Sequence, residues 1–451
     1  GTKVADLDFS LIPVNDLDFE AYGKQDVATL QQVTRELLSI RSMEPYDWRE
    51  QVIAGINSQF SRNGVLVDAE LARERVEQLE KRKSELMDYL VREYDFPTRG
   101  KMPWRSTEGK RAIFKILSDN GITEATRPDW ERTATGNLSL GGEVLVSITE
   151  GTKAAELGTA LAQLQGQRTL PQLALASMHS DGKVHPEISS LQRSGRFSVQ
   201  RPGLTIWGAH EGRDADKEYF IAEPRHKVLE FDYSAADARA VAAMSGDKEF
   251  AKRFAPGVKP HNITGEIFFG KKAYYADKDN LYGVAKAGGH AMAYRIGATK
   301  LAKTLSDKGE RNFTVSEAYR FLDNYKMAYP DVHRWQEAST QIGDKGSIRN
   351  QWGRRMVVDP ERSFTQSSAL LGQSFTREIL CDGLIDMLHD DIRLIHWIRF
   401  TVHDAVVAVV PEEHVVYAME KIAEHLSATH HGIDFPVEHG EPANNWKEAG
   451  H

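Results

Sequence analysis

The sequence predicts an α+β fold in which helical units are attached to an antiparallel β core. Residues 228–232 read as a strand, and the apolar runs 397–404 and 405–410 follow each other so closely that they predict a β-hairpin. A long amphipathic segment, residues 69–93, has leucines at helical spacing with mixed charges opposite them. The chain of 451 residues is 41% hydrophobic, which suffices for roughly two to four packed units.

The remaining elements follow from the same periodicities. The hairpin would carry His403 and Asp404 at its turn, and the polar Ser234 would open the helix after the first strand. Residues 95–150 are rich in Gly, Pro and Thr, so only short helical pieces are expected there. The longer expected helices are residues 26–40, 69–93, 152–164, 235–244, 284–305 and 315–327.

Composition excludes several classes of protein. No stretch approaches the ~20 apolar residues that a membrane span requires, and the amino terminus lacks a basic-then-apolar signal. We therefore expect a cytoplasmic protein with no membrane partner. The single cysteine, Cys381, excludes an intrachain disulfide and a thiolate metal cluster, so stability has to come from packing.

Charge is distributed unevenly along the chain. The net charge of −8 argues against indiscriminate binding to nucleic acid, because such domains are usually basic on at least one face. Residues 248–303, however, hold 11 Lys and Arg against 4 Asp and Glu, so this segment is +7 and the remainder is −15. One region is thus suited to meeting anions, with a solvated charged surface as the alternative.

An aspartate ends two of the predicted strand segments, Asp232 and Asp404. If these strands are neighbours, the carboxylates can supply hard oxygen ligands to two divalent ions, which lie roughly 4 Å apart in enzymes of nucleotidyl transfer. Lys286, His290 and Tyr294 recur at four-residue spacing, so a Lys and two rings can meet a triphosphate and a base. Taken singly, a strand-end Asp is more often a turn residue, and rings at this spacing are more often part of a core. Together these features indicate template-directed nucleotidyl transfer.

The motifs and their order resemble the family A DNA polymerases, most closely the bacteriophage type, from about residue 57 to residue 451. Asp232-Tyr233-Ser234 with Arg239 and Ser245-Gly246-Asp247 is similar to the first palm motif, and His403-Asp404 with Pro411-Glu412-Glu413 is similar to the third. Lys286, His290 and Tyr294 lie where the fingers helix places its Lys, aromatic residue and Tyr. Further matches are Ser194-Gly195-Arg196-Phe197-Ser198 with Pro202, and the chain end with Gly440, Asn445, Trp446 and His451.

The resemblance implies a right-hand fold of thumb, palm and fingers, and a DNA polymerase that extends a primer on template DNA with dNTPs. The implied divisions are an exonuclease tail and linker at residues 1–45, thumb at 46–165, palm at 166–246 and 346–451, and fingers at 247–345. Tyr22 and Asp26 resemble two residues of the 3′–5′ exonuclease of this family, most of which we expect to be absent. Accessory proteins are not indicated by the sequence.

The resemblance also assigns ligands for metal and phosphate. Asp232 and Asp404 would hold two Mg²⁺ ions, for which Mn²⁺ could substitute, helped by the backbone carbonyl of Tyr233. Lys286 would face the triphosphate and could protonate the leaving pyrophosphate. His261 lies where the family has a His that touches a phosphate.

Other residues are assigned to the nucleotide and the DNA by the same resemblance. His290 would stack on the incoming nucleotide, and Tyr294 would lie near the templating base. Arg196 and Gln373 would read minor-groove acceptors, which every correct base pair presents. His403 would lie beside the primer end.

The chain departs from the family pattern around the phosphates and the metal. Tyr282 stands where the family has an Arg, which puts a γ-phosphate contact in doubt unless Lys278 or Lys272 replaces it. Ala405 replaces an acidic residue that often follows His-Asp, which leaves two candidate metal carboxylates. Arg295 replaces the glycine after the fingers Tyr, so the local helix geometry is open.

Two further departures concern the sugar and the fingers helix. Ala236 and Asp237 replace an Ile-Glu pair, so the carboxylate that crowds a ribose 2′-hydroxyl is one methylene shorter and we expect weaker exclusion of ribonucleotides. Gly288 and Gly289 inside a helix should cost about 2 kcal/mol relative to alanines. Such a pair indicates close approach of a base, a hinge or plain helix packing.

Three other functions are compatible with part of this pattern. A single-subunit RNA polymerase would share the aspartates and Lys286, but its motif typically lacks a carboxylate such as Asp237. A nuclease would use a carboxylate pair without the Lys286 face or Arg196. A catalytically silent primer-template binding protein would not need both aspartates. Primer extension with dNTPs or NTPs discriminates among these functions.

Overall fold

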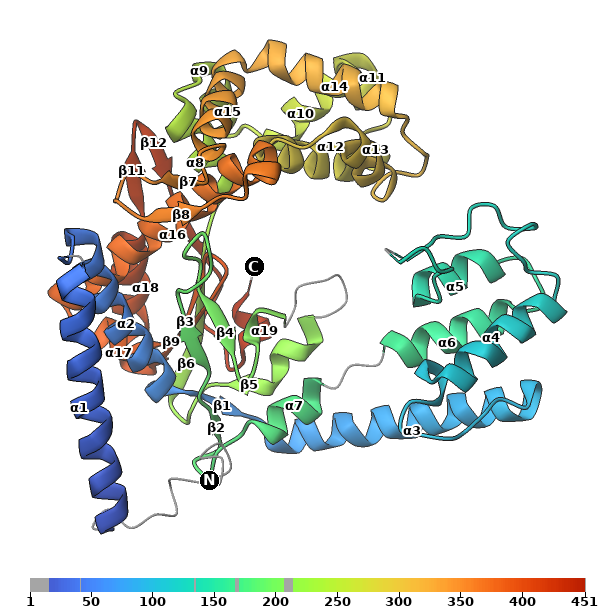
Figure 1. Ribbon diagram of the computed structural model, residues 1–451, viewed down its shortest axis with the longest axis horizontal. Coiled ribbons are helices and arrows are strands. Elements are labelled where there is room, and N and C mark those ends of the chain that lie inside the picture. The colour runs from blue at the N-terminus through green and yellow to red at the C-terminus, as the bar shows by residue number, and fades with distance from the viewer. Residues whose placement is uncertain (1–15, 41, 134, 167–169, 207–213, 451) are drawn as a thin grey trace.

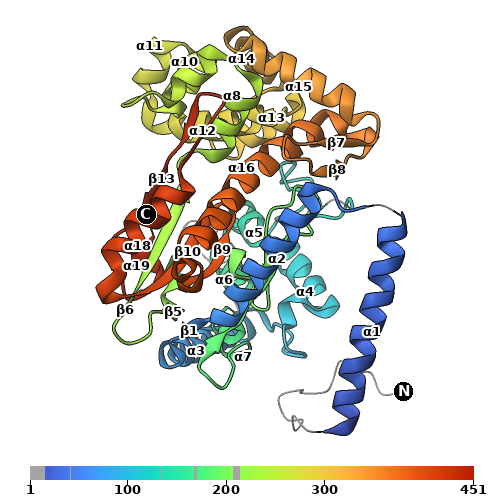
Figure 2. The same ribbon diagram turned by 90° about the vertical axis from the view of Figure 1, so that its left-hand side faces the viewer.

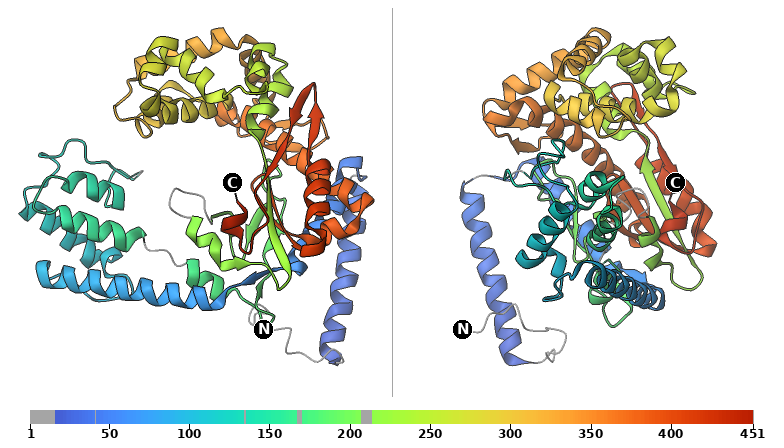
Figure 3. Two further views of the ribbon diagram at one scale, coloured as in Figure 1. Left: turned by 180° about the vertical axis from the view of Figure 1, so that it is seen from behind. Right: turned by 90° about the vertical axis from the view of Figure 1, so that its right-hand side faces the viewer.

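The computed structural model describes residues 16–40, 42–133, 135–166, 170–206 and 214–450 (Figure 1). Its centre is a four-stranded antiparallel sheet with the order β13-β6-β10-β9. Two helical units project from the sheet toward the same side, one at the top and one at the lower right of Figure 1, and Figure 3 shows them from behind. The expected α+β class, with helical units on an antiparallel core, is confirmed.

The strands associated with the two aspartates are neighbours in this sheet. β6 (His226–Tyr233) pairs with β10 (Ala405–Pro411), β9 (Ile398–Val402) lies on the other side of β10, and β13 (Val437–His439) lies on the other side of β6. The predicted hairpin is confirmed, because Val402 faces Ala405 and leaves His403 and Asp404 as a two-residue turn. His403 has a left-handed φ of 55° there.

The expected start of the hairpin at Trp397 is wrong. Trp397 ends the helix α17 (Ile392–Trp397), and the strand begins one residue later. The side chain of Asp391 caps this helix by accepting a hydrogen bond from the backbone N–H of Arg393, which stabilises the helical turn.

Both faces of the central sheet are buried, because its strands alternate between two hydrophobic clusters. Phe231 and Val406 pack with α2 (Pro45–Asn63), α16 (Ser363–Asp390) and α18 (Val415–Leu426), whereas Val228 and Val407 point to the opposite face. A fully buried side chain of this size contributes roughly 1.5–3 kcal/mol. This packing holds the strand ends that carry the aspartates.

The upper helical unit is a layered bundle with its own core. The helix expected at residues 315–327 is confirmed, but a continuous helix at 284–305 is wrong. The chain leaves α12 at Tyr294, Arg295 adopts a left-handed φ of 58°, and Gly297 precedes the next helix. The helices are α8 (Ala236–Ser245), α9 (Lys248–Ala251), α10 (Pro260–Phe269), α11 (Lys271–Ala276), α12 (Lys278–Ala293), α13 (Ala298–Ser306), α14 (Val315–Ala328) and α15 (Pro330–Gly343).

Helix packing accounts for the glycine pair in α12. A Cβ on Gly288 would lie 2.5 Å from the ring of Phe268, and a Cβ on Gly289 would lie 2.9 Å from Thr264 Oγ1. Both of these neighbours belong to α10. The glycines therefore let α10 and α12 approach closely, without a base or a hinge being required.

The lower helical unit is built on the long helix α3 (Ala69–Tyr94), which the sequence predicted. Asp68 caps its start by accepting from the backbone N–H of Leu71, and Leu86 and Leu90 pack into the core of the unit. The other helices are α4 (Thr107–Asp119), α5 (Gly142–Thr149), α6 (Ala155–Gly166) and α7 (Leu170–Ala176). A small sheet of β2 (Lys183–Val184), β1 (Val65–Val67) and β5 (Phe220–Ile221) lies at its base.

Three hairpins and two terminal helices complete the described chain. The hairpins are β3 (Glu187–Ser189) with β4 (Ser198–Gln200), β7 (Ser347–Arg349) with β8 (Arg355–Val357), and β11 (Ala428–His430) with β12 (Ile433–Phe435). α19 (Trp446–Ala449) packs near β6, whereas α1 (Leu17–Ile40) stands beside the rest of the molecule with no buried residue (Figure 2). His451 lies outside the described residues. Among those described, no helix is both long enough and apolar enough to cross a membrane.

Candidate active site

A cavity of about 680 Å³ lies where the ends of β6 and β10 meet α8, α10 and α12. It gathers residues that are more than 100 positions apart in the sequence. The predicted site residues that line it are Asp232, Tyr233, Asp237, His261, Lys286, His290, His403 and Asp404. Tyr294, Arg196 and Gln373 are not part of its lining.

The two aspartates reach this cavity from adjacent strand ends. Extending the β6–β10 register by one pair places Ala405 opposite Asp232, and Asp404 is the preceding residue, in the turn. Asp232 is exposed, whereas the Asp404 side chain is only 16% exposed. Burial raises the pKa of Asp404 to about 7. The positive charge of Arg196 lowers this pKa, but the negative charges of Asp237 and Asp232 act in the opposite direction.

These two carboxylates fit a divalent cation. In the part of the chain that the structure describes, Asp404 Oδ1 is buried without a hydrogen-bond partner. Such an oxygen is costly unless a ligand satisfies it, and Mg²⁺ prefers hard oxygen donors. Over the same described residues, no group of three or more His, Cys, Asp or Glu side chains forms a metal site. Two carboxylates would therefore leave the other coordination positions to substrate and water.

Arg196 joins two of the carboxylates in this region. Its Nη2 donates to Asp237 Oδ1 at 2.7 Å and to Asp404 Oδ2 at 3.0 Å, and its side chain is 17% exposed. Thr376 also donates from Oγ1 to Asp237 Oδ1, at 3.5 Å. The loop between β3 and β4 carries Arg196. The structure thus places the guanidinium of Arg196 against the aspartates. Its contact with the minor groove of DNA stays a prediction.

One face of α12 supplies a cation and a ring to the cavity. Lys286 and His290 are exposed and line it, whereas Tyr294 follows the last residue of the helix, is partly buried and is not part of the lining. The rings of His290 and Tyr294 meet edge to face with 5.6 Å between centroids. Tyr294 packs so closely on Gly372 that a Cβ there would lie 2.7 Å from the ring. Burial raises the pKa of Tyr294 well above its usual range.

His261 lies in the first turn of α10, on the cavity wall. Burial lowers its pKa to about 4, and the positive charges of Lys286 and Arg253 act in the same direction. His261 is therefore a neutral imidazole at pH 7. Its ring meets that of Tyr282 at 5.7 Å, so the residue that replaces the expected arginine packs against the phosphate-binding candidate.

Arg253 is a cavity residue that sequence reasoning missed. It is 3% exposed, and its guanidinium lies 4.7 Å from the Phe250 ring centroid. Within the described chain, its Nε and Nη1 have no hydrogen-bond partner. Lys278 and Lys272, the cations considered as replacements for the missing arginine, do not line the cavity. The excess of Lys and Arg over residues 248–303 indicated a region suited to anions, but it did not single out Arg253.

The remaining predicted residues lie at the edge of the site. His403 lines the cavity from the hairpin turn, where burial and then Arg196 lower its pKa, partly offset by Asp232 and Asp237. Gln373 lies on α16, partly buried and away from the cavity lining. The structure therefore brings His403 into the cavity lining with the aspartates, whereas Gln373 is not part of that lining.

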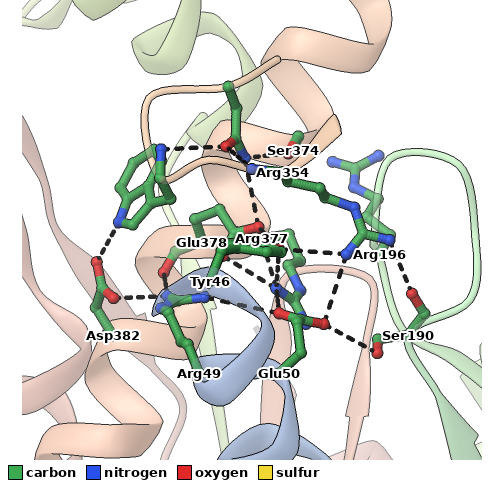
Figure 4. Close-up of polar contacts among 12 residues, drawn as sticks. Tyr46, Arg49, Glu50, Ser190, Arg196, Arg354, Ser374, Arg377, Glu378 and Asp382 are labelled. Atoms are coloured by element: carbon green, nitrogen blue, oxygen red, sulfur yellow. Dashed lines mark hydrogen bonds and ion pairs between the residues drawn. The ribbon is translucent and has the colours of Figure 1, made fainter. Parts of the chain in front are cut away.

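Sequence reasoning also missed a cluster of charged residues beside the Arg196 loop (Figure 4). We call it the arginine–carboxylate cluster, and its members are Arg49, Glu50, Arg354, Arg377, Glu378 and Asp382. The side chains of Arg377 and Glu378 are 1% and 0% exposed. The available signal was this adjacent charged pair, which directly precedes the apolar residues Ile379 and Leu380 in the middle of α16.

Comparison with known proteins identifies relatives over most of the chain. The sequence model of DNA polymerase family A matches residues 111–448. The DNA polymerases of Mycobacterium phages D29 and L5 are each 26% identical, over 85% and 91% of this chain. These matches cover 60% and 63% of the two phage proteins, so the chain spans less than two thirds of their length. DNA polymerase I of Geobacillus stearothermophilus is 24% identical over 81% of this chain and 42% of its own length.

A solved structure shares the fold. It is described as the POL domain of Pol1 from M. smegmatis in complex with DNA primer-template and dNTP. It superimposes with a TM-score of 0.76 at 18% identity, over 89% of this chain and 70% of its own.

Proposed function

The chain belongs to DNA polymerase family A, and from this premise we propose that it is a DNA-directed DNA polymerase that adds dNTPs to a primer 3′ end on template DNA. The observation that carries the proposal is the meeting of Asp232, Asp404 and Lys286 in one cavity. The ligands of the M. smegmatis structure support the same partners here. We propose that this activity takes place in the cytoplasm, where primer-template DNA and dNTPs would be available to the protein.

Asp232 and Asp404, with the backbone carbonyl of Tyr233, would hold two Mg²⁺ ions, or Mn²⁺ in their place. When bound, such ions activate the attacking oxygen and neutralise charge on the leaving phosphates. Asp404 contributes a buried oxygen that lacks a partner among the described residues, and Asp232 contributes an exposed carboxylate. Because Asp232 lies at the end of β6 and Asp404 lies in the tight turn before its paired neighbour β10, little reorganisation is needed when substrate arrives.

The opposite wall of the cavity suits a triphosphate. Lys286 is exposed there and would bind a phosphate and protonate the leaving pyrophosphate. His261, being neutral, would donate one N–H to a phosphate oxygen. The buried guanidinium of Arg253, which also lines the cavity, adds positive potential, and the low dielectric of its surroundings makes this charge effective.

The base and the DNA would meet the remaining residues. His290 would stack on the incoming nucleotide, with Tyr294 behind it near the templating base. Arg196 and Gln373 would contact the minor groove, and His403 would lie beside the primer end. Asp237 would face the sugar and limit the entry of a 2′-hydroxyl.

The domain divisions fit this function with one change. We propose that residues 166–246 and 346–451 form the palm, that 247–345 form the fingers and that 1–45 are the exonuclease tail and linker. The thumb, expected at 46–165, is better begun at α3, because Ile53, Ile56 and Phe60 of α2 pack in the core of the central sheet.

Extension of a labelled primer on a DNA template tests the proposal, with dNTPs and NTPs in separate reactions containing Mg²⁺. We expect extension with dNTPs, and we expect Asp232→Asn to abolish it while primer-template binding is kept, since binding rests mainly on phosphate contacts. Extension with NTPs alone would indicate an RNA polymerase. Shortening of the primer would indicate a nuclease, and binding without extension by the unmodified chain would indicate a silent binding protein.

A further inference from the structure

The arginine–carboxylate cluster joins α2 to α16 and lies directly beside the loop that carries Arg196 (Figure 4). Its three arginines face three carboxylates, so their charges balance. The most buried members are on α16, where neither Arg377 nor Glu378 is more than 1% exposed. Charges this deep are tolerated only when they are paired and hydrogen-bonded.

Glu50 is the residue that connects the two arginines nearest the loop. Its Oε1 accepts from Arg377 Nη1 at 2.6 Å, and its Oε2 accepts from Arg377 Nη2 at 2.9 Å, which is a bidentate pair. Its Oε2 also accepts from Arg354 Nη1 at 3.5 Å. Glu50 therefore contacts both guanidinium groups, closely at Arg377 and at longer range at Arg354, and its Oε2 also accepts from Ser190 Oγ of the loop at 3.3 Å.

Arg354 holds the part of the loop that precedes Arg196. Its Nη2 donates to the backbone oxygens of Ser190 and Gln192, both at 3.1 Å. Gly195 has a left-handed φ of 83°, and a Cβ there would lie 2.6 Å from the guanidinium carbon of Arg354. The loop backbone is thus pressed against this side chain.

Arg377 holds the residue that follows Arg196. Its guanidinium carbon lies 5.3 Å from the ring centroid of Phe197, which is 4% exposed. The residues on both sides of Arg196 are therefore held by arginines that share Glu50. Arg196 in turn donates to Asp237 and Asp404.

We propose that Glu50 is a positioning residue, which acts through Arg354 and Arg377 to set the place of Arg196 against the cavity aspartates. This inference rests on the proposed function, since it concerns the same site. A merely structural cluster would stabilise the palm but would not act through Arg196. The two possibilities differ in whether the effect of Glu50 depends on Arg196.

Single-nucleotide incorporation by Glu50→Gln, by Arg196→Ala and by the double variant tests this dependence. A misplacement of about 1 Å can cost about 10²-fold in rate, so we expect Glu50→Gln to lower kcat by roughly 10- to 100-fold with a small change in KM. In the Arg196→Ala background, Glu50→Gln should lower kcat by less than about 2-fold. A full and independent loss in that background would overturn the proposal.

Asp382→Asn is the matched control within the cluster. Its carboxylate accepts from Arg49 Nη2 at 2.6 Å and from Trp352 Nε1 at 2.9 Å, but it makes no hydrogen bond to the loop. We expect this variant to keep kcat within about 3-fold at a comparable loss of thermal stability. If kcat falls as far as in Glu50→Gln, the effect is structural and the proposal fails.

Hydrogen exchange of the peptide covering residues 190–197 gives a readout that does not need activity. The backbone N–H of Gly195 donates to the Gln192 oxygen at 2.8 Å, and its protection should fall in Glu50→Gln but not in Asp382→Asn. Arg354→Lys, which keeps the charge but cannot reproduce the planar guanidinium contacts, should show the same loss if Glu50→Gln does not fold. Unchanged exchange in a folded Glu50→Gln protein would refute the positioning role even if the chain had no polymerase activity.

Discussion

Replacement of Asp404 by Asn should make the metal-free protein more stable at pH 8 while abolishing primer extension. The pKa of Asp404 is raised to about 7 in the folded protein, whereas an Asp in an unfolded chain titrates near 3.9. The folded state therefore holds the proton more tightly. Its stabilising contribution is complete below about pH 4 and is lost as the pH rises toward 7.

The magnitude follows from these two values. A difference of about three in pKa corresponds to ~4 kcal/mol of penalty once the folded carboxylate is ionised. Asn resembles the protonated acid in shape and charge, and it can still accept from Arg196. We therefore expect Asp404→Asn to raise the free energy of unfolding by roughly 2–4 kcal/mol at pH 8, and by less than half as much at pH 5.

Urea unfolding at both pH values, with and without Mn²⁺, measures this difference. Mn²⁺ should stabilise the wild type at pH 8 but not the variant, because a ligand stabilises only a state that binds it. Asp386→Asn, which removes an exposed carboxylate from α16, is the control and should change little. Equal stability of wild type and Asp404→Asn at pH 8, or a gain independent of pH, would refute the reasoning.

Three further predictions concern α12 and the selection of the sugar. Lys286→Ala should lower the incorporation rate by about 10²-fold or more and leave primer-template affinity unchanged. The control Lys278→Ala, outside the cavity lining, should leave the rate unchanged. Single-turnover kinetics and a binding titration measure both quantities, and a loss of affinity with a normal rate in Lys286→Ala would contradict the assignment. Steady-state incorporation opposite guanine measures the discrimination of dCTP from CTP. Asp237→Ala should weaken this discrimination by roughly 10- to 200-fold, and Asp237→Glu should strengthen it by a similar factor. An unchanged ratio in both variants would mean that Asp237 is purely structural. Gly288→Ala gains about 1 kcal/mol of helix propensity but must move the Phe268 ring, so we expect a net loss of up to ~2 kcal/mol in chemical denaturation. Gly283→Ala, whose nearest neighbour would be 3.8 Å away, should instead stabilise the protein.

The strand ends and the hairpin could be predicted because their signals are local. Two apolar β-rich runs without an intervening loop leave only a tight turn, which places His403 and Asp404 together. The break after α12 could not be read in the same way, because helical periodicity continues through residues 294–297 and a left-handed Arg295 has no distinctive composition. Local patterns therefore identified four residues of the cavity, Asp232, Lys286, His290 and Asp404, but misjudged the end of one helix.

The arginine–carboxylate cluster shows a different limit. Glu50 and Arg377 are 327 residues apart in the chain, and amphipathic patterns place charged residues on solvated faces. Only the folded chain shows that these charges neutralise each other in the interior. Arg253 escaped notice for the same reason, since a buried arginine and an exposed one look alike in a count of charges.

Two turns of the same length differ in how much change they could absorb. His403 and Asp404 join β9 to β10, and His431 and Gly432 join β11 to β12, where both turn residues have left-handed φ values of 51° and 75°. An insertion between residues 431 and 432 would lengthen a hairpin that does not line the cavity. An insertion between His403 and Asp404 would shift the Asp404 carboxylate, which lines the cavity, relative to β6. A tag or a fused domain is therefore better placed between His431 and Gly432, and evolutionary length variation should be found in that turn and not at His403 and Asp404.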